Sequence, residues 1–336
     1  MKFVGANILS IDTFEREDID TLFAVAKQME PYAQRRKATD VLKGAILGNM
    51  FFEASTRTRI SFGCAFNLLG GEVRETTGIQ SSALSKGESL RDTARVLSGF
   101  SDVIAMRHPD AGSVAEFASA SRVPVINGGD GDNEHPTQAL LDLYTIEKEL
   151  SSKQKRIDGL RIAMIGDLKF GRTVHSLAKL LCRYNKVEVY LISPEALQMP
   201  ETIVEMMREA GHKVTVSSDL EANIAHVDIA YSTRIQEERF SSQQEADTYR
   251  GRFRLNSAIY TKNCEPNTVI MHPLPRDSRA EASELATDLD DNPNLAIFRQ
   301  ADNGVTIRMA LFAVILDVVD QVERNSREIN WYTGRR

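Results

Sequence analysis

The stretch LRIAMIGDLKFGRTVHSLAKLLCRYNKVEVYLI, residues 160–192, decides the fold class. Its apolar run at 160–165 predicts a buried strand, residues 166–170 a turn, and residues 171–183 a helix. A second apolar run at 187–192 predicts the next strand. Buried strands that alternate with helices indicate a parallel sheet with helices on both faces.

The same alternation extends along the whole chain. The expected further strands are 45–51, 102–106, 123–127, 213–216, 228–232 and 268–271. The expected helices are 15–33, 56–69, 88–100, 135–150, 201–210 and a closing helix at 304–322, and the expected loops include 128–132 and 243–254. A length of 336 residues fits two domains. We therefore expect an α/β protein with two doubly wound parallel-sheet domains joined by helices, and with the active site in the cleft between them.

Composition excludes several classes of protein. A net charge of -6 and a pI near 5.7 argue against a general affinity for nucleic acid or an anionic membrane. Cys64, Cys182 and Cys264 are too few and too widely spaced for a disulfide framework or a zinc site, so reduced thiols are expected. The N-terminus does not resemble a secretory signal, and the most apolar stretch, 310–316, is too short to span a bilayer. We expect a cytoplasmic protein.

The segment Ser55-Thr56-Arg57-Thr58-Arg59 lies where the strand 45–51 gives way to the helix 56–69. In parallel sheets, ligands bind beyond the carboxyl ends of the strands. Ser55 suits the N-cap, and a helix N-terminus with hydroxyls and a planar guanidinium suits a phosphate. A capped helix with exposed arginines explains the segment alone equally well. The segment therefore predicts a phosphate site only if other candidate ligands lie at the same edge of the sheet.

Other polar residues follow the first-half strands at the same expected edge. Arg107 follows the strand 102–106, and His135 and Gln138 lie one turn apart where the next helix opens. His135 can donate a hydrogen bond to a carbonyl oxygen and stabilise negative charge there. A loop at 80–87 carries Ser82 and Lys86, which can reach an anion. Each group alone is also typical of an ordinary surface loop or a capped helix.

The second half adds residues suited to an acceptor substrate. Arg172 and Arg234 each follow an expected strand and together can bind a dicarboxylate. The segment His272-Pro-Leu-Pro-Arg276 has a backbone fixed by prolines, so its carbonyl groups can face a substrate amine. The histidines and carboxylates lack zinc-ligand spacing, and no covalent nucleophile motif is present. We expect neither a metal nor a cofactor.

Five segments in order resemble the aspartate carbamoyltransferase family, and more closely the catalytic chains of its bacterial members. They are FEASTRTR at 52–59, MRHP at 106–109, HPTQ at 135–138, GDLKFGRTVHS at 166–176 and HPLPR at 272–276. The resemblance implies transfer of a carbamoyl group from carbamoyl phosphate to L-aspartate in pyrimidine synthesis. It also implies a carbamoyl phosphate-binding domain of residues 1–138 plus 303–336 and an aspartate-binding domain of residues 139–302.

The resemblance further implies roles for single residues. The phosphate ligands would be Ser55, Thr56, Arg57 and Thr58. The carbonyl oxygen, which becomes negative during the reaction, would be contacted by Thr58, Arg107 and His135. The carbamoyl amine would be held by Gln138 and by the backbone at Leu274 and Pro275. The aspartate ligands would be Arg172, Arg234 and Gln236. Ser82, for carbamoyl phosphate, and Lys86, for aspartate and catalysis, would enter from a neighbouring subunit of a homotrimer.

Some questions stay open at the level of sequence. Glu53 and Arg239 match positions that form interdomain contacts, and Arg59 fits a ligand contact or a structural ion pair. An ornithine carbamoyltransferase is the nearest alternative, but its usual His-Cys-Leu-Pro segment and Ser-Met-Gly loop are absent. A non-catalytic homologue is a further alternative, although every motif residue is present. Family members occur as bare catalytic trimers and as trimers joined to nucleotide-binding regulatory chains, and both arrangements remain open.

Overall fold

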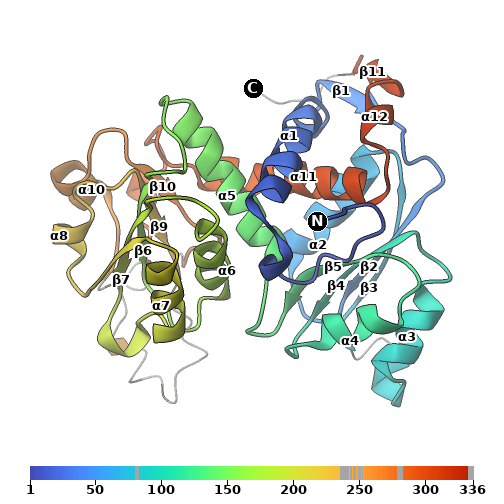
Figure 1. Cartoon of the computed structure of the whole chain (residues 1–336), viewed down its shortest axis with the longest axis horizontal. Helices are drawn as coiled ribbons and strands as arrows, with labels where there is room; N and C mark the ends of the chain where they lie inside the picture. Colours follow the sequence, from blue (N-terminus) through green and yellow to red (C-terminus); the bar gives the residue numbers. More distant parts are fainter. Residues whose placement is uncertain are drawn as a thin grey trace. The chain divides into compact units, whose positions relative to one another are not determined.

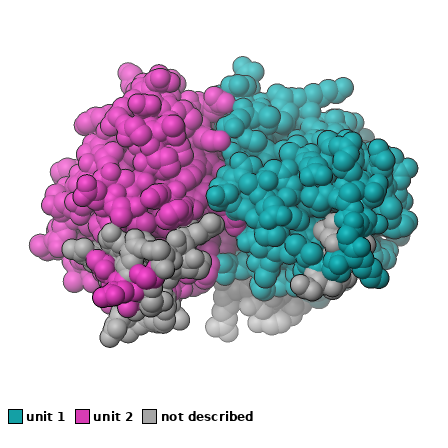
Figure 2. Space-filling model, turned by 90° about the horizontal axis from the view of Figure 1, so that it is seen from below, with its two compact units in different colours: residues 1–140, 302–336 teal, residues 141–301 magenta. Residues whose placement is uncertain are grey.

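The computed structural model describes residues 1–79, 83–234, 242, 244, 247–248, 251, 253–277 and 283–331. Ser82, Gln236, Arg239 and half of the expected loop 243–254 lie outside these ranges. The chain forms two compact units (Figure 2). Unit 1 is Met1–Leu140 with Asp302–Arg336, and unit 2 is Leu141–Ala301. The chain passes from one unit to the other inside two helices, α5 (Pro136–Ser151) and α11 (Ile297–Ile315).

Unit 1 is built on a four-stranded parallel sheet with the order β3-β2-β4-β5 (Figure 1). Its strands are β2 (Ile46–Phe51), β3 (Glu72–Thr77), β4 (Val103–His108) and β5 (Val125–Asp130). Its helices include α1 (Arg16–Ala33), α2 (Thr56–Leu68), α3 (Leu90–Leu97), α4 (Ser113–Ala120) and α12 (Val319–Val322). A separate antiparallel pair joins β1 (Lys37–Thr39) to β11 (Ser326–Glu328).

The apolar face of α11 is buried in unit 1, where it packs on α2. Phe312 contacts Phe62 and Phe66, with ring centroids 6.1 and 4.9 Å apart and steeply inclined rings. Such edge-to-face packing adds to the hydrophobic burial of the rings. The closing helix of the chain therefore packs against a helix from the first half of the sequence.

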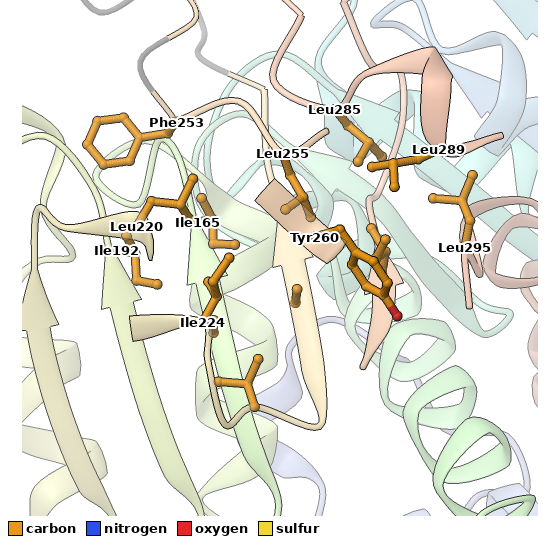
Figure 3. Packing of buried hydrophobic residues seen from close by; sticks show 14 of the residues in the cluster. Ile165, Ile192, Leu220, Ile224, Phe253, Leu255, Tyr260, Leu285, Leu289 and Leu295 are labelled. Carbon is orange, nitrogen blue, oxygen red and sulfur yellow. The ribbon is translucent and has the colours of Figure 1, made fainter. Parts of the chain in front are cut away.

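Unit 2 is built on a five-stranded parallel sheet with the order β10-β9-β6-β7-β8. Its strands are β6 (Arg161–Ile165), β7 (Glu188–Ile192), β8 (Lys213–Ser217), β9 (Ile229–Ser232) and β10 (Val269–Met271). Its helices include α6 (Arg172–Leu181), α7 (Glu201–Glu209), α8 (Leu220–Asn223) and α10 (Ser257–Asn263). Figure 3 shows Ile165 and Ile192 from the sheet packed with Leu255, Tyr260 and Leu285 in its core.

The expected α/β class with two parallel-sheet units is confirmed, and several expected elements differ in detail. The expected loop 128–132 is partly strand, because β5 continues to Asp130 beside β4. The closing helix begins earlier and ends earlier than 304–322, and a separate short helix, α12, follows it. The strand β3 was not expected, since it is a polar, largely exposed edge strand without an apolar run. In the part of the chain that is described, no helix is long and apolar enough to cross a membrane.

Candidate functional site

The candidate residues of unit 1 follow three adjacent strands of its sheet. The order β2-β4-β5 places the segment after Phe51, the end of β4 and the segment after Asp130 at one edge. Phe51 lies opposite Arg107 in the parallel register, and the Phe52 amide donates to the Arg107 carbonyl at 2.9 Å. The predicted first-half candidates therefore start from neighbouring strand ends.

The segment Ser55–Arg59 opens helix α2, as expected. Ser55 is the N-cap residue with extended backbone, but its hydroxyl makes no capping hydrogen bond among the described residues. Ser55 therefore occupies the predicted N-cap position, but without a capping hydrogen bond to its side chain in the described part of the chain. Thr56 and Arg57 are exposed, and partial desolvation lowers the pKa of the Arg57 guanidinium, which stays charged at neutral pH. A helix N-terminus without a side-chain cap retains N–H donors for an anion.

Arg59 has a structural role in this arrangement. Its guanidinium forms an ion pair with Glu75 of β3, and the same carboxylate accepts a hydrogen bond from Asn49 Nδ2 at 2.8 Å. Asn49 Nδ2 also donates to the Arg59 carbonyl at 3.1 Å. These contacts join the first turn of α2 to the sheet, and they favour the structural ion pair over a ligand contact for Arg59.

Arg107 is buried at the end of β4, with 7% of its surface exposed. Its Nε lies 3.0 Å from Glu53 Oε2, and its Nη1 donates to the Gly128 carbonyl at 3.2 Å. Glu53, expected from the resemblance in an interdomain contact, thus pairs with Arg107 inside unit 1. Arg239, the other position expected in an interdomain contact, lies outside the described residues.

Arg107 and His135 converge on Gly129. A Cβ at Gly129 would lie 2.7 Å from Arg107 Nη1 and 3.5 Å from His135 Cδ2, and Gly129 has a φ of +118°. Arg107 therefore occupies the space that a side chain at 129 would need, and His135 lies in van der Waals contact with the same space. His135, at the start of α5, is 5% exposed. The structure brings two of the predicted charge-stabilising groups together.

Asn127 and Asp130 hold the end of β5 that carries Gly129, and sequence reasoning gave neither a role. The Gly129 amide donates to Asn127 Oδ1 at 2.7 Å, and Asn127 Nδ2 donates to Asp130 Oδ1 at 2.9 Å. Asp130 also accepts from the Glu134 amide at 3.1 Å. Short polar side chains that accept backbone N–H groups are typical of turns like the one that follows Asp130, so this signal was present in the sequence.

The neighbouring His108 lies against the ring of Phe52, with ring centroids 5.8 Å apart. Burial lowers its pKa, although nearby carboxylates such as Asp110 oppose that shift. His108 Nδ1 accepts a hydrogen bond from the Asp110 amide at 3.1 Å, which requires this nitrogen to be unprotonated. His108 therefore supports the loop rather than donating from this nitrogen to a ligand.

In unit 2, the loops after β6 and β9 touch at Gly166 and Thr233. A Cβ at Gly166 would lie 2.5 Å from the Thr233 carbonyl oxygen, so this close approach requires glycine. Thr233 Oγ1 donates to the Ile165 carbonyl at 3.0 Å. Arg234 follows Thr233 directly, and Arg172 begins α6 after the loop of β6; both are half-buried. The two predicted aspartate ligands thus extend from adjoining loops.

The segment His272–Arg276 follows β10, the strand beside β9. The Leu274 amide donates to His272 Nδ1 at 2.8 Å, so His272 Nε2 carries the proton and donates to Glu284 Oε1 at 2.7 Å. Leu274 has a φ of +56°, a left-handed conformation that a β-carbon disfavours. Glu284 was missed by sequence reasoning, because nothing in a single sequence connects it to this loop.

The remaining predicted residues are less constrained. Gln138 is half-buried in the first turn of α5, and Pro275 and Lys86 are exposed. Within the described ranges, the Lys86 side chain has no hydrogen bond or ion pair. Across those same ranges, no group of three or more histidines, cysteines or acidic residues is arranged to hold a metal.

Comparisons with known proteins agree with this arrangement. Residues 6–148 match the family described as aspartate/ornithine carbamoyltransferase, carbamoyl-P binding domain, and residues 158–315 match its Asp/Orn binding domain. The chain is 73% identical to the aspartate carbamoyltransferase catalytic subunit of Cellvibrio japonicus, over 100% of this chain and 99% of the relative. It is 55% identical to the corresponding subunit of Dichelobacter nodosus, over 96% of this chain and 93% of that one.

Solved structures give the same result. An aspartate transcarbamoylase from Trypanosoma cruzi, in complex with aspartate and phosphate, has a TM-score of 0.83 and 38% identity, covering 94% of this chain and 96% of that one. The catalytic subunit of the M. jannaschii enzyme has a TM-score of 0.85 and 40% identity, covering 96% and 99%. This chain therefore belongs to the aspartate/ornithine carbamoyltransferase family.

Proposed function

We propose that the chain is the catalytic subunit of an aspartate carbamoyltransferase. It transfers the carbamoyl group of carbamoyl phosphate to L-aspartate, giving N-carbamoyl-L-aspartate and phosphate in pyrimidine biosynthesis. The observation that carries the proposal is the convergence of Arg107 and His135 on Gly129, at the sheet edge where helix α2 opens. Two donors at that point suit a carbonyl oxygen that gains negative charge.

Unit 1 would bind carbamoyl phosphate. The phosphate oxygens accept hydrogen bonds from the first turn of α2 and from the side chains of Ser55, Thr56, Arg57 and Thr58. The uncapped N-terminus of α2 supports this role. Gln138 and the backbone at Leu274 and Pro275 orient the carbamoyl amine, which leaves the carbonyl oxygen directed at Thr58, Arg107 and His135.

The acceptor would be a dicarboxylate, because Arg172 and Arg234 both carry a fixed positive charge suited to carboxylates. Gln236 completes the set of aspartate ligands. The ammonium group of ornithine would meet repulsion from Arg234. This charge preference favours L-aspartate over the ornithine alternative, as do the names of the relatives given above.

The reaction balances without a protein nucleophile. The neutral amine of aspartate attacks the carbonyl carbon, so a C–N bond forms while the C–O bond to phosphate breaks. The bonding electrons leave with the phosphate, and the departing phosphate takes up the amine proton. The protein contributes orientation of the two substrates and stabilisation of the oxyanion.

The subunits would assemble as a cytoplasmic homotrimer in which Ser82 and Lys86 act in the site of a neighbour. The exposure of Lys86 supports this role. Mixing Lys86→Met subunits with His135→Ala subunits, after dissociation, should restore activity in hybrid trimers, because some sites then contain both native residues. Titration with CTP and ATP distinguishes a bare trimer from an assembly with a nucleotide-binding regulatory chain.

The direct test incubates the purified chain with carbamoyl phosphate and L-aspartate. Mass spectrometry should detect N-carbamoyl-L-aspartate, and a phosphate assay should detect an equal amount of phosphate above the spontaneous breakdown of carbamoyl phosphate. Omitting either substrate should abolish the product. Phosphate release without a carbamoylated product would contradict the proposal.

A further inference from the structure

Arg308, in helix α11, is a buried arginine that joins two other helices of unit 1. Only 3% of its surface is exposed. Its Nη1 donates to Ser61 Oγ of α2 at 2.9 Å, and its Nη2 donates to Thr137 Oγ1 of α5 at 3.2 Å. Its Cζ lies 4.7 Å from the centre of the Phe62 ring. One guanidinium thus contacts two helices whose sequences lie far from its own.

The two hydroxyl partners lie beside the proposed carbamoyl phosphate ligands. Ser61 follows Thr58 by three residues and Arg57 by four, so it lies one helical turn further along the same side of α2. Thr137 lies between His135 and Gln138 in the first turn of α5. Arg308 therefore contacts the second turn of α2 and the first turn of α5, the two helices that carry the donor site.

Arginine is suited to this position in a way that other residues are not. Its planar guanidinium presents donors in a rigid fork, so hydrogen bonds to two fixed acceptors also fix the distance between those acceptors. A lysine carries one terminal nitrogen on a flexible stem and does not provide that spacing. The ring of Phe62 further restricts the plane of the guanidinium, through a cation–π contact.

We propose that Arg308 is a positioning residue that sets the spacing between the phosphate-binding turn of α2 and His135 at the start of α5. This inference rests on the proposed function. With Arg308 in place, carbamoyl phosphate whose phosphate group is held by Ser55–Thr58 keeps its carbonyl oxygen within reach of His135. Without it, the two helix N-termini lose a common anchor, and both donor binding and turnover suffer.

The test compares Arg308→Lys with Arg299→Met. Arg299 is a matched control because it lies in the same helix and also contacts α5, through Glu149 at 2.6 and 3.1 Å, but at the other end of α5. Steady-state kinetics with each substrate should show that Arg308→Lys lowers kcat at least tenfold and raises the KM for carbamoyl phosphate at least fivefold. The KM for L-aspartate should change less than twofold, and Arg299→Met should leave all three constants within twofold.

Two milder variants test the Ser61 and Thr137 contacts of Arg308 one at a time, and they keep the test valid if Arg308→Lys does not fold. Ser61→Ala removes the acceptor on α2 and should mainly raise the KM for carbamoyl phosphate. Thr137→Val removes the acceptor on α5 and should mainly lower kcat. If Arg308→Lys keeps native kinetics, or if Ser61→Ala and Thr137→Val change kcat and both KM values equally, the positioning role is wrong.

The outcome also separates this inference from the proposed function. A wild-type chain that carbamoylates aspartate while Arg308→Lys behaves identically overturns only the role of Arg308. A wild-type chain with no transferase activity overturns the proposed function. In that case calorimetry with inorganic phosphate still tests the positioning role of Arg308. Arg308→Lys should weaken phosphate binding at least fivefold, and unchanged binding would refute that role.

Discussion

Glu284 is expected to stabilise unit 2 strongly, because its buried carboxylate holds the loop after β10. It is 5% exposed and accepts from His272 Nε2 at 2.7 Å and from the Asp277 amide at 3.2 Å. Glu284→Ala leaves both donors without this acceptor, and an unsatisfied buried donor costs about 1–3 kcal/mol. Because the Asp277 amide is only partly buried, the apparent free energy of unfolding should fall by about 1–3 kcal/mol, mainly through the buried His272 donor.

Glu284→Gln is the informative companion variant. Its amide oxygen still accepts from His272, so only the charge-assisted part of the bond is lost, about 1 kcal/mol. Glu221→Ala provides a control in the same unit, because Glu221 also accepts from two side chains, Lys262 and Asn263, but is exposed. That control should change stability little.

Urea denaturation at pH 7, followed by fluorescence and by residual activity, measures these differences. If Leu274 orients the carbamoyl amine, Glu284→Ala should also lower kcat at a temperature where the variant is folded. An unfolding free energy for Glu284→Ala that equals both the wild-type and the Glu284→Gln values would refute the reasoning.

Three further predictions follow from single side chains. His135→Ala should lower kcat by about 10²–10³-fold, equivalent to about 2.7–4 kcal/mol, while phosphate binding measured by calorimetry changes little; unchanged turnover would contradict its role. Arg59→Met should lower the melting temperature through loss of the Glu75 pair, with a smaller effect on the KM for carbamoyl phosphate than Arg57→Met has. Burial lowers the pKa of His212 in the folded protein, although the contact of its ring with the Leu181 carbonyl opposes that shift. The neutral ring therefore contributes stability above the pKa of about 6.5 that histidine has in the unfolded chain. This contribution is lost as the pH falls through the lower pKa of the folded state. His212→Gln should flatten the dependence of unfolding free energy on pH between 7.5 and about 5, and an unchanged slope would contradict this.

The sequence predicted those parts of the fold that depend on local apolar patterning. The strands β6 and β7 and the helix between them follow directly from their buried runs. The edge strand β3 was missed because its residues are mostly polar and exposed, and its pairing with β2 is set by tertiary contact. We predicted a loop at residues 128–130 because glycines weaken the strand signal, yet β5 pairs with β4 again at Asp130 after an irregularity in the ladder.

The site shows the same division between local and distant information. Ser55 occupies the predicted N-cap position, but its side-chain hydrogen bonding depends on rotamer and surroundings that a sequence does not specify. The convergence of Arg107 and His135 follows from a glycine between them, which only the folded sheet reveals. Arg308 was overlooked since its partner Ser61 lies 247 residues away along the chain. No local pattern marks such a contact.

Acceptor choice tests the central claim most directly. The measurement is kcat/KM for L-aspartate and for L-ornithine, with carbamoyl phosphate saturating and with both carbamoylated products quantified by mass spectrometry. Because the proposed site pairs arginines with two carboxylates, L-aspartate should be preferred by at least about 10⁴-fold. Equal rates, a preference for L-ornithine, or no carbamoylated product with either amino acid would contradict the account.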